Sequence, residues 1–497
     1  MDPRTPGQAT SPHAAPMSIG GAPSGAPSAS GAPPRPSGAP PRRLVAALAL
    51  SMLLASLGTS IANVALPTLT STFDASFGQV QWVVLAYLLS MTVTAVTVGR
   101  VGDAVGRRRV LVVGLAVFTI ASAACALAPT LGVLVAARSL QGVGAAVMMA
   151  LPLALVRDVV PPERTGAAMG LLGTTSAVGT ALGPAGGGLL IGAFGWPAIF
   201  VAMVPLGIGA LLLTMRGLPG TQAHARREGR FDWPGALVLT AALVAYALSM
   251  TSPDAVPGAT TGTLLLAATG LLGVLVVVER RSVAPLVPLS MLRSPNLGGG
   301  MVMNLLVATV MMSTLVVGPF YLAGGLGLGP AAIGLTMAIG PVVSACSGVF
   351  AGRIVDRAGA PGTTALGLVV MTAGATTLAL LPAVWGLPGY VLALVVLTPG
   401  YQLFLAANNT NVMADVVPER RGTVSGMLSL SRNLGQITGA AAMGALFAAA
   451  AGSSGDRAPA AATVAGMQTT AAVAALLLVA ATGVARLVRA RGGPEVI

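Results

Sequence analysis

The chain of 497 residues is too apolar for a soluble protein, because hydrophobic residues make up 55% of it, charged residues 8%, and its mean hydropathy is +0.85. Soluble domains carry about 25% charged residues. In a soluble protein the net charge of +13 would suggest a nucleic-acid partner. Here the 27 basic residues are all arginines, spread over short segments between apolar runs, so the charge indicates orientation at an anionic membrane surface and no nucleic acid is expected.

The N-terminal segment, residues 1–43, consists mainly of Pro, Gly, Ala and Ser with GAP-type repeats. This composition cannot bury a core, which predicts a disordered tail. Fourteen apolar runs follow, each near the ~20 residues that cross a bilayer. They predict membrane-spanning helices at residues 44–64, 80–100, 109–128, 131–155, 166–192, 196–215, 234–250, 259–279, 297–321, 331–351, 362–382, 387–407, 422–450 and 467–488.

The arginines give these helices an orientation. Of the 27 arginines, 24 fall in the two tails, in every second segment between runs, or at the run ends that border them, whereas Arg457 falls on the other side and two lie well inside runs. Because positive residues favour the cytoplasmic side, both ends of the chain are predicted to be cytoplasmic. The chain is therefore expected to be a multi-pass protein of the cell (inner or plasma) membrane. Its arginine-only, Ala- and Gly-rich composition suggests a GC-rich bacterial genome.

An internal repeat divides the chain into two halves. The segment Pro162–Gly166 reappears 256 residues later as Pro418–Gly422, and the runs that follow keep their glycines in step: Gly166 and Gly422, Gly170 and Gly426, Gly179 and Gly435, Gly183 and Gly439. Parallel six-helix repeats are the architecture of transporters whose substrate site lies between the halves. The predicted fold is all-α, with six-helix bundles at 44–215 and 297–488, an inserted helix pair at 234–279 and a cytoplasmic tail at 489–497.

The connection between the second and third runs is a glycine-rich charged turn. It is duplicated 253 residues later, since Gly99, Asp103 and Gly106 match Gly352, Asp356 and Gly359. Glycine permits a positive φ, and an aspartate can cap a helix start or pair with a neighbouring arginine such as Arg107 or Arg108. A turn that only obeys the positive-inside rule is the alternative to a functional role.

The fifth run carries a small-residue motif. Gly179, Gly183 and Gly187 share one helix face, where small residues let two helices pack closely. Gly188 follows, and Pro184 removes a backbone hydrogen bond and favours a kink. Tight packing without any further role is the alternative interpretation.

Two arginines, Arg138 and Arg432, fall inside predicted helices. An arginine at the centre of a membrane helix costs roughly 2.5–3.5 kcal/mol on insertion scales. Such a residue usually faces a polar cavity, and the alternative is a buried arginine bonded to backbone carbonyls. The repeat partner of Arg432 is Ser176, so this charge belongs to one half only.

These features resemble the major facilitator superfamily over residues 44–490. The turn at Asp103 is similar to the superfamily's gating motif, the pattern Leu134-x-x-x-Arg138-x-x-Gln141-Gly142 to its helix-four motif, and Gly179 to Gly188 to the helix-five signature of antiporters. With fourteen runs, the chain resembles the branch of drug:proton antiporters, whose members export amphipathic toxic compounds.

The resemblance implies roles for single residues. Arg138, with Gln141, would take part in proton coupling, and Asp103 would latch the gate. Gly183 and Pro184 would shape the helix-five interface. No cofactor or metal is implied, because the driving force would be the proton-motive force.

Two departures from that branch concern the first and sixth runs. The branch usually begins Leu-Asp-x-Thr-Ile-Val-Asn-Val-Ala-Leu-Pro, whereas this chain has Gly58 in place of the aspartate. Met203 stands where an asparagine is expected. Both put the usual proton and substrate chemistry in doubt.

The predicted spans contain no acid at mid-helix, so the membrane core would hold two arginines and no carboxylate. Two like charges ~4 Å apart repel by about 4 kcal/mol at an effective dielectric of 20. Neutral or anionic amphiphiles are therefore favoured over cations, with Arg138 or Arg432 meeting an electronegative group. Polar side chains that could line the path, or only join helices, are Thr59, Asn63, Asn304, Gln402, Asn408, Asn409 and Gln436.

The sequence thus predicts a proton-linked exporter of amphipathic small molecules, a drug or antibiotic resistance transporter that works by alternating access as a monomer. The alternative is a transporter of the same fold for a specific anionic or neutral metabolite. An enzyme is not expected, since the runs contain no histidine and no acidic cluster. Asp103 and Asp158, at inner helix ends, are the remaining candidates for carrying the proton.

Overall fold

Every regular element of the described residues is helical in the computed structural model. The structure describes residues 42–160, 162–217, 233–251, 259–282, 291–414, 416–417, 420–452 and 459–491. Its helices are α1 (Arg42–Phe73), α2 (Phe77–Val105), α3 (Arg107–Ala126), α4 (Leu131–Val159), α5 (Pro162–Phe194), α6 (Ala198–Val201), α7 (Met203–Gly217), α8 (Trp233–Thr251), α9 (Ala259–Arg281), η1 (Met291–Arg293), α10 (Pro295–Phe320), η2 (Tyr321–Gly325), α11 (Pro330–Ala358), α12 (Ala360–Trp385), α13 (Leu387–Ala414), α14 (Arg421–Thr438), η4 (Gly439–Met443), α15 (Gly444–Ala450) and α16 (Ala460–Arg491).

Each predicted run coincides with one helix or with a short series of helices. Several helices continue past the apolar run, as α1 does to Phe73, because a helix keeps its backbone hydrogen bonds after the side chains become polar. The predicted run 196–215 divides into α6 and α7. Of the predicted N-terminal tail, all but Arg42 and Arg43 lies outside the described residues, and α16 continues to Arg491, into the predicted C-terminal tail.

Thirteen helices of the described residues are long and apolar enough to cross a membrane. The predicted run without such a helix is 422–450, which the structure divides into α14, the π-helical segment η4, and α15. The helix α14 is more polar than its neighbours because it contains Arg421, Arg432 and several serines. The count of fourteen spans, the boundaries of the halves and the cytoplasmic position of both termini stay predictions.

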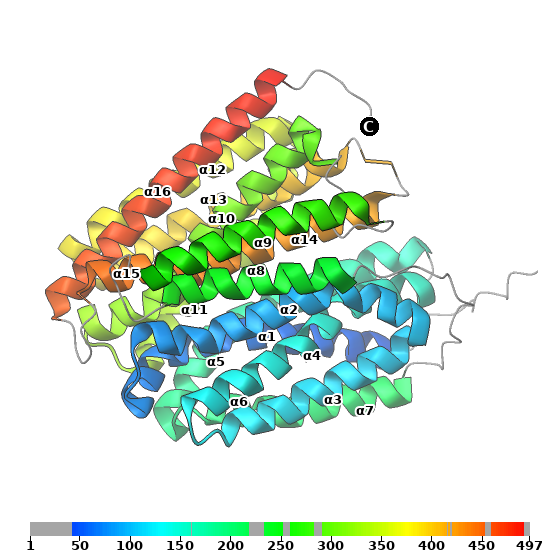
Figure 1. Cartoon of the computed structure of the whole chain (residues 1–497), viewed down its shortest axis with the longest axis horizontal. Helices are drawn as coiled ribbons and strands as arrows, with labels where there is room; N and C mark the ends of the chain where they lie inside the picture. The colour runs from blue at the N-terminus through cyan, green and yellow to red at the C-terminus, as the bar shows by residue number, and fades with distance from the viewer. Residues whose placement is uncertain are drawn as a thin grey trace, which may run out of the picture. The chain divides into compact units, whose positions relative to one another are not determined.

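The helices pack as two halves and an inserted pair. In the first half α1 packs against α4, α5 and α7, and α4 also packs against α2 and α3. In the second half α10 packs against α13, α14 and α16, and α12 against α13 and α16. Figure 1 shows α1–α7 and α10–α16 as two groups of roughly parallel rods, with α8 and α9 between them in this view. The helix α8 contacts α9, α2 and η4, so the inserted pair touches both halves.

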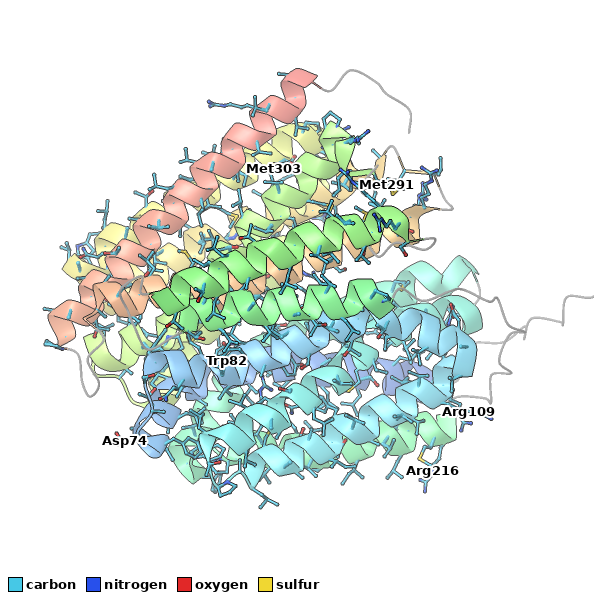
Figure 2. The ribbon with its side chains drawn as sticks, in the orientation of Figure 1. Asp74, Trp82, Arg109, Arg216, Met291 and Met303 are labelled. Atoms are coloured by element: carbon cyan, nitrogen blue, oxygen red, sulfur yellow. The ribbon has the colours of Figure 1, made fainter. Side chains whose placement is uncertain are left out.

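The two ends of the bundle differ in charge. Arg109 and Arg216 lie at one end and Asp74 and Trp82 at the other, as Figure 2 shows. We call the first the arginine-rich end, because the turns of α2–α3 and α11–α12 and the ends of α7, α9 and α16 bring arginines there. By the positive-inside rule it is the end predicted to face the cytoplasm.

Candidate functional site

Arg138 lies inside the first half and is fully buried. Its Nε donates to the Val83 carbonyl at 2.9 Å, and Nη1 and Nη2 both donate to the Gly58 carbonyl at 3.2 Å. Nη1 also donates to Gln141 Oε1 at 2.5 Å. The guanidinium carbon lies 4.1 Å from the centre of the Tyr87 ring, in cation–π geometry. The buried charge is therefore balanced by oxygen dipoles and a ring face from α1, α2 and α4.

The surrounding side chains hold this arrangement in place. Gln141 Nε2 donates to Ser122 Oγ at 2.7 Å, and Tyr87 Oη donates to the Ala55 carbonyl at 2.9 Å. A Cβ atom at Gly58 would lie 3.0 Å from Tyr87 Oη and 3.3 Å from the Phe118 ring, so the ring and the hydroxyl occupy the space where a helix-one aspartate would begin. Of the two sequence interpretations, Arg138 has the geometry of an arginine bonded to backbone carbonyls, and its role in coupling stays a prediction.

The helix-five motif packs against both halves. Gly179, Gly183 and Gly187 lie against α1, where a Cβ atom would overlap the Leu53 carbonyl, Ser60 and Ile61 respectively. Gly188 instead faces α11 of the other half. A Cβ atom there would lie 2.5 Å from the Pro330 carbonyl and 2.7 Å from the Gly334 Cα, so only glycine allows this crossing.

A second crossing joins α2 to the η4–α15 segment, and it follows the internal repeat. Gln81 is buried, and its Nε2 donates to the Ala440 carbonyl at 2.9 Å, beside Gly444. Applying the repeat offsets of 256 and 253 residues, Ala440 and Gly444 match Pro184 and Gly188, and Gln81 matches Gly334. Gln81 was not predicted from the sequence, because its repeat partner Gly334 stands out only through its contact with Gly188 in the structure.

Both crossings lie towards the arginine-poor end of the bundle. Phe77, at the start of α2, adds ring contacts to Phe320 at 4.5 Å and to Phe447 at 5.4 Å between centroids. By contrast, Gly170, Gly173, Gly348 and Gly352, towards the arginine-rich ends of α5 and α11, have no packing atom within 4 Å of a Cβ position. The contacts that join the halves are thus concentrated at one end.

The duplicated turns contain glycines with positive φ, as predicted. Gly106 has φ of 105° and Gly359 has φ of 76°, which explains why both positions are glycine. The exposed Asp103 pairs with Arg107 of its own turn, Nη2 to Oδ1 at 2.8 Å, while Asp356 is exposed. Because the Asp103 pair is local, it does not join the halves in this state, and the gating role of these turns stays a prediction.

The other residues of the gating turn and the predicted path have the following places. Arg108 Nη2 donates to the Met215 carbonyl of α7 at 2.7 Å, and Gly99 is exposed. Three amides donate to backbone carbonyls: Asn63 within α1, Asn304 to Leu428 of α14 and Asn408 to Gly300 of α10. The last two bonds join helices. Thr59 bonds to the Ala55 carbonyl, Gln402 donates to Ser344 of α11, Asn409 is exposed, and Gln436 is partly exposed.

Arg432 differs from Arg138 in exposure and in hydrogen bonding. It is partly exposed on α14, and Tyr401 of α13 lies within range of its charge. Its guanidinium makes no hydrogen bond or ion pair to another side chain or carbonyl among the described residues. Of the two arginines within predicted spans, it is therefore the one whose side chain is partly exposed.

The inserted pair lies along the seam between α2 and α14. Trp82 Nε1 of α2 donates to Thr251 Oγ1 of α8 at 2.9 Å, and Tyr246 of α8 lies close to Thr438 of α14. On α9, Glu279 is a carboxylate that the structure buries, with 4% exposure. This burial was not predicted, because it depends on packing that the sequence does not show.

Comparison with known proteins assigns this arrangement to a family. The model of the Major Facilitator Superfamily matches residues 48–440. The chain belongs to this superfamily. It is therefore a membrane transporter and not an enzyme, and it spans the plasma membrane several times.

Two relatives and one solved structure show the range of this superfamily. The chain is 30% identical over 401 residues to the riboflavin transporter RibZ of Clostridioides difficile, covering 81% of this chain and 87% of the relative. It is 29% identical over 409 residues to the tetracenomycin C resistance and export protein of Streptomyces glaucescens, covering 82% and 76%. A bacterial homolog of the human lysosomal transporter Spinster, solved in an inward-facing and unoccupied conformation, has a TM-score of 0.66, 17% identity and coverage of 92% and 100%.

Proposed function

We propose that this transporter exports amphipathic small molecules across the cytoplasmic membrane and that protons moving inward drive the export. The observation that carries the proposal is the packing of helix five, which lies on α1 with one glycine face and on α11 of the other half through Gly188. A helix held by glycines on both sides can slide with little steric cost, as alternating access requires.

The position of the crossings supports an assignment of this state within the proposed transport cycle. The halves meet towards the arginine-poor end, which is predicted to be outside. On the proposal, this state would therefore be an inward-open transporter that takes substrate from the cytoplasm. In the opposite state, the turns at Asp103 and Asp356 would close the arginine-rich end. The tetracenomycin relative, named for resistance and export, supports the direction.

A second candidate function is the transport of one specific neutral or anionic metabolite. Two observations favour it: Gly58 replaces the acid of the antiporter branch, and a relative of similar identity is named a riboflavin transporter. Both functions use the same fold and the same two crossings, so they differ in substrate range and in coupling.

Reconstitution in liposomes tests the proposal. The purified protein is given an imposed pH gradient, and internal pH is followed as rhodamine 123, fluorescein or riboflavin is added. Proton flux that starts with an amphiphile, and vanishes in protein-free liposomes, supports proton-linked export. Substrate transport that does not depend on the pH gradient would contradict the coupling. Proton flux with riboflavin alone would favour the metabolite transporter.

A further inference from the structure

The polar helix α14 packs against its neighbours through one side. Val424, Ser431 and Gly435 lie on this side, where Ser431 Oγ donates to the Met301 carbonyl of α10 and a Cβ atom at Gly435 would overlap the Leu305 carbonyl. Thr438, seven residues after Ser431 and therefore on the same side, lies close to Tyr246 of the inserted helix α8. These contacts direct the remaining side of α14 towards neither α10 nor α8.

That remaining side carries the polar residues. Ser425, Ser429, Arg432 and Gln436 are spaced by four, three and four residues, so they form one stripe along the helix. The two serines are exposed, and Arg432 and Gln436 are partly exposed. Near the end of the stripe, η4 meets Gln81 of the first half. The stripe therefore leads from the arginine-rich end to the point where the two halves touch.

Among the described residues, no acid pairs with the charge on this stripe. The helices α10, α13 and α14 contain no Asp or Glu, and Asp103 at the end of α2, a helix that also contacts α14, pairs with Arg107. Arg138, by contrast, uses four hydrogen bonds and a Tyr87 ring to offset its burial. A guanidinium held within a membrane helix without such partners is stabilised by water or by a ligand that accepts its hydrogen bonds.

We infer that Arg432 is the anchor of the substrate site and binds an anionic oxygen of an amphipathic substrate, such as a carboxylate, sulfonate or phenolate. Gln436 on the stripe and the Tyr401 ring on α13 would flank that group. The inference rests on the proposed function, because it names the substrate class of that transporter. The planar, forked guanidinium suits a two-oxygen acceptor, and the apolar remainder of the substrate would lie on the surrounding helices.

Binding of two dyes that share a xanthene ring system and differ in charge tests the inference. The full chain in phosphatidylcholine nanodiscs is titrated with anionic fluorescein and with cationic rhodamine 123, and the fluorescence anisotropy of each dye gives Kd. The variants are Arg432→Gln, Arg432→Lys and Arg421→Gln. Arg421 is the matched control, because it lies 11 residues earlier, about three turns, on the same face but exposed at the arginine-rich end.

The inference expects fluorescein to bind wild type saturably, with Kd rising about tenfold or more in Arg432→Gln and less in Arg432→Lys. Arg421→Gln should leave Kd unchanged, and rhodamine 123 should not lose affinity in Arg432→Gln. Absence of saturable fluorescein binding, equal Kd in wild type and Arg432→Gln, or an equal loss in Arg421→Gln would each overturn it.

Two further arms separate the remaining explanations. In the first arm, phosphatidylglycerol is added to the discs. If fluorescein affinity then falls in wild type but not in Arg432→Gln, a lipid headgroup is the true occupant of the site. That result would also overturn the inference. Liposome transport is measured independently of binding. Binding at Arg432 without proton-linked transport would reject the proposed function alone, whereas transport that survives Arg432→Gln with fluorescein would reject the inference alone.

Discussion

Each half of the transporter has one arginine well inside a predicted span, and the two arginines have opposite surroundings. Arg138 is sealed among α1, α2 and α4 with four hydrogen bonds. Arg432 lies on a polar stripe of α14 with no such bond among the described residues. The difference shows that an arginine inside a predicted span can be sealed by packing in one half and partly exposed in the other. The repeat alone does not distinguish these roles.

The largest effect is expected from substituting Arg138, and it concerns the stability of the folded protein. Arg138→Ala removes four charge-assisted hydrogen bonds, leaves Gln141 Oε1 without its donor and opens a cavity beside Tyr87. Hydrogen bonds to charged groups contribute about 1.5–3 kcal/mol each, so we expect a loss of at least ~3 kcal/mol. Thermal unfolding in detergent should show a clear drop in melting temperature. Arg138→Lys, which keeps the charge, should fall between the alanine variant and wild type.

The next effect concerns the glycine crossing between α5 and α11. In Gly188→Leu the side chain would overlap the Pro330 carbonyl and Gly334, an overpacking that costs about 1–3 kcal/mol and separates the halves at this end. Transport rate in liposomes should fall about tenfold, since tenfold corresponds to ~1.4 kcal/mol. Gly186→Leu is the matched control, because a Cβ atom at Gly186 meets nothing within 4 Å. Equal losses in the two variants would contradict the role of the crossing.

The second crossing should be less sensitive than the first. Gln81→Ala removes one neutral hydrogen bond, to the Ala440 carbonyl. It also removes the side-chain amide that lies against Gly444. A bond of this kind contributes about 0.5–1.5 kcal/mol. We expect a two- to tenfold change in the transport rate, with the melting temperature nearly unchanged. If the transport rate fell more in Gln81→Ala than in Gly188→Leu, the second crossing would matter more than the first, which would contradict this expectation.

The smallest expected effect is at the duplicated turn. Asp103→Asn removes an exposed ion pair with Arg107, and such pairs contribute about 0.2–1 kcal/mol, so stability should hardly change. If the turn closes the arginine-rich end during the cycle, turnover should fall more than substrate affinity. Single-turnover transport and equilibrium binding separate the two quantities. Weakened binding at unchanged turnover would count against a gating role.

Most of the fold could be predicted from the sequence, because apolar run length and arginine placement act locally. The glycines of helix five and of the turns at Gly106 and Gly359 were also predictable, since backbone geometry demands them. The break in the run at 422–450 was not, because it depends on the polar stripe of α14 and on a π-helical segment.

The site was only partly predictable. The sequence placed Arg138 and Arg432 in the membrane but could not tell a sealed guanidinium from an available one, because that depends on carbonyls at Gly58 and Val83 of other helices. Burial of Gln81 between the halves, and of Glu279 on α9, likewise arises from contacts distant in sequence. For Asn304 and Asn408 the sequence left open whether they line the path or join helices, and the structure shows that both donate to carbonyls of other helices.

The most direct test of the contrast between the two arginines measures melting temperature and fluorescein Kd on the same preparations of wild type, Arg138→Gln and Arg432→Gln. The account predicts that Arg138→Gln lowers the melting temperature while the folded fraction keeps its Kd. It predicts that Arg432→Gln keeps the melting temperature and weakens Kd by about tenfold or more. A weakened Kd in a thermally stable Arg138→Gln, or an unchanged Kd in Arg432→Gln, would contradict it.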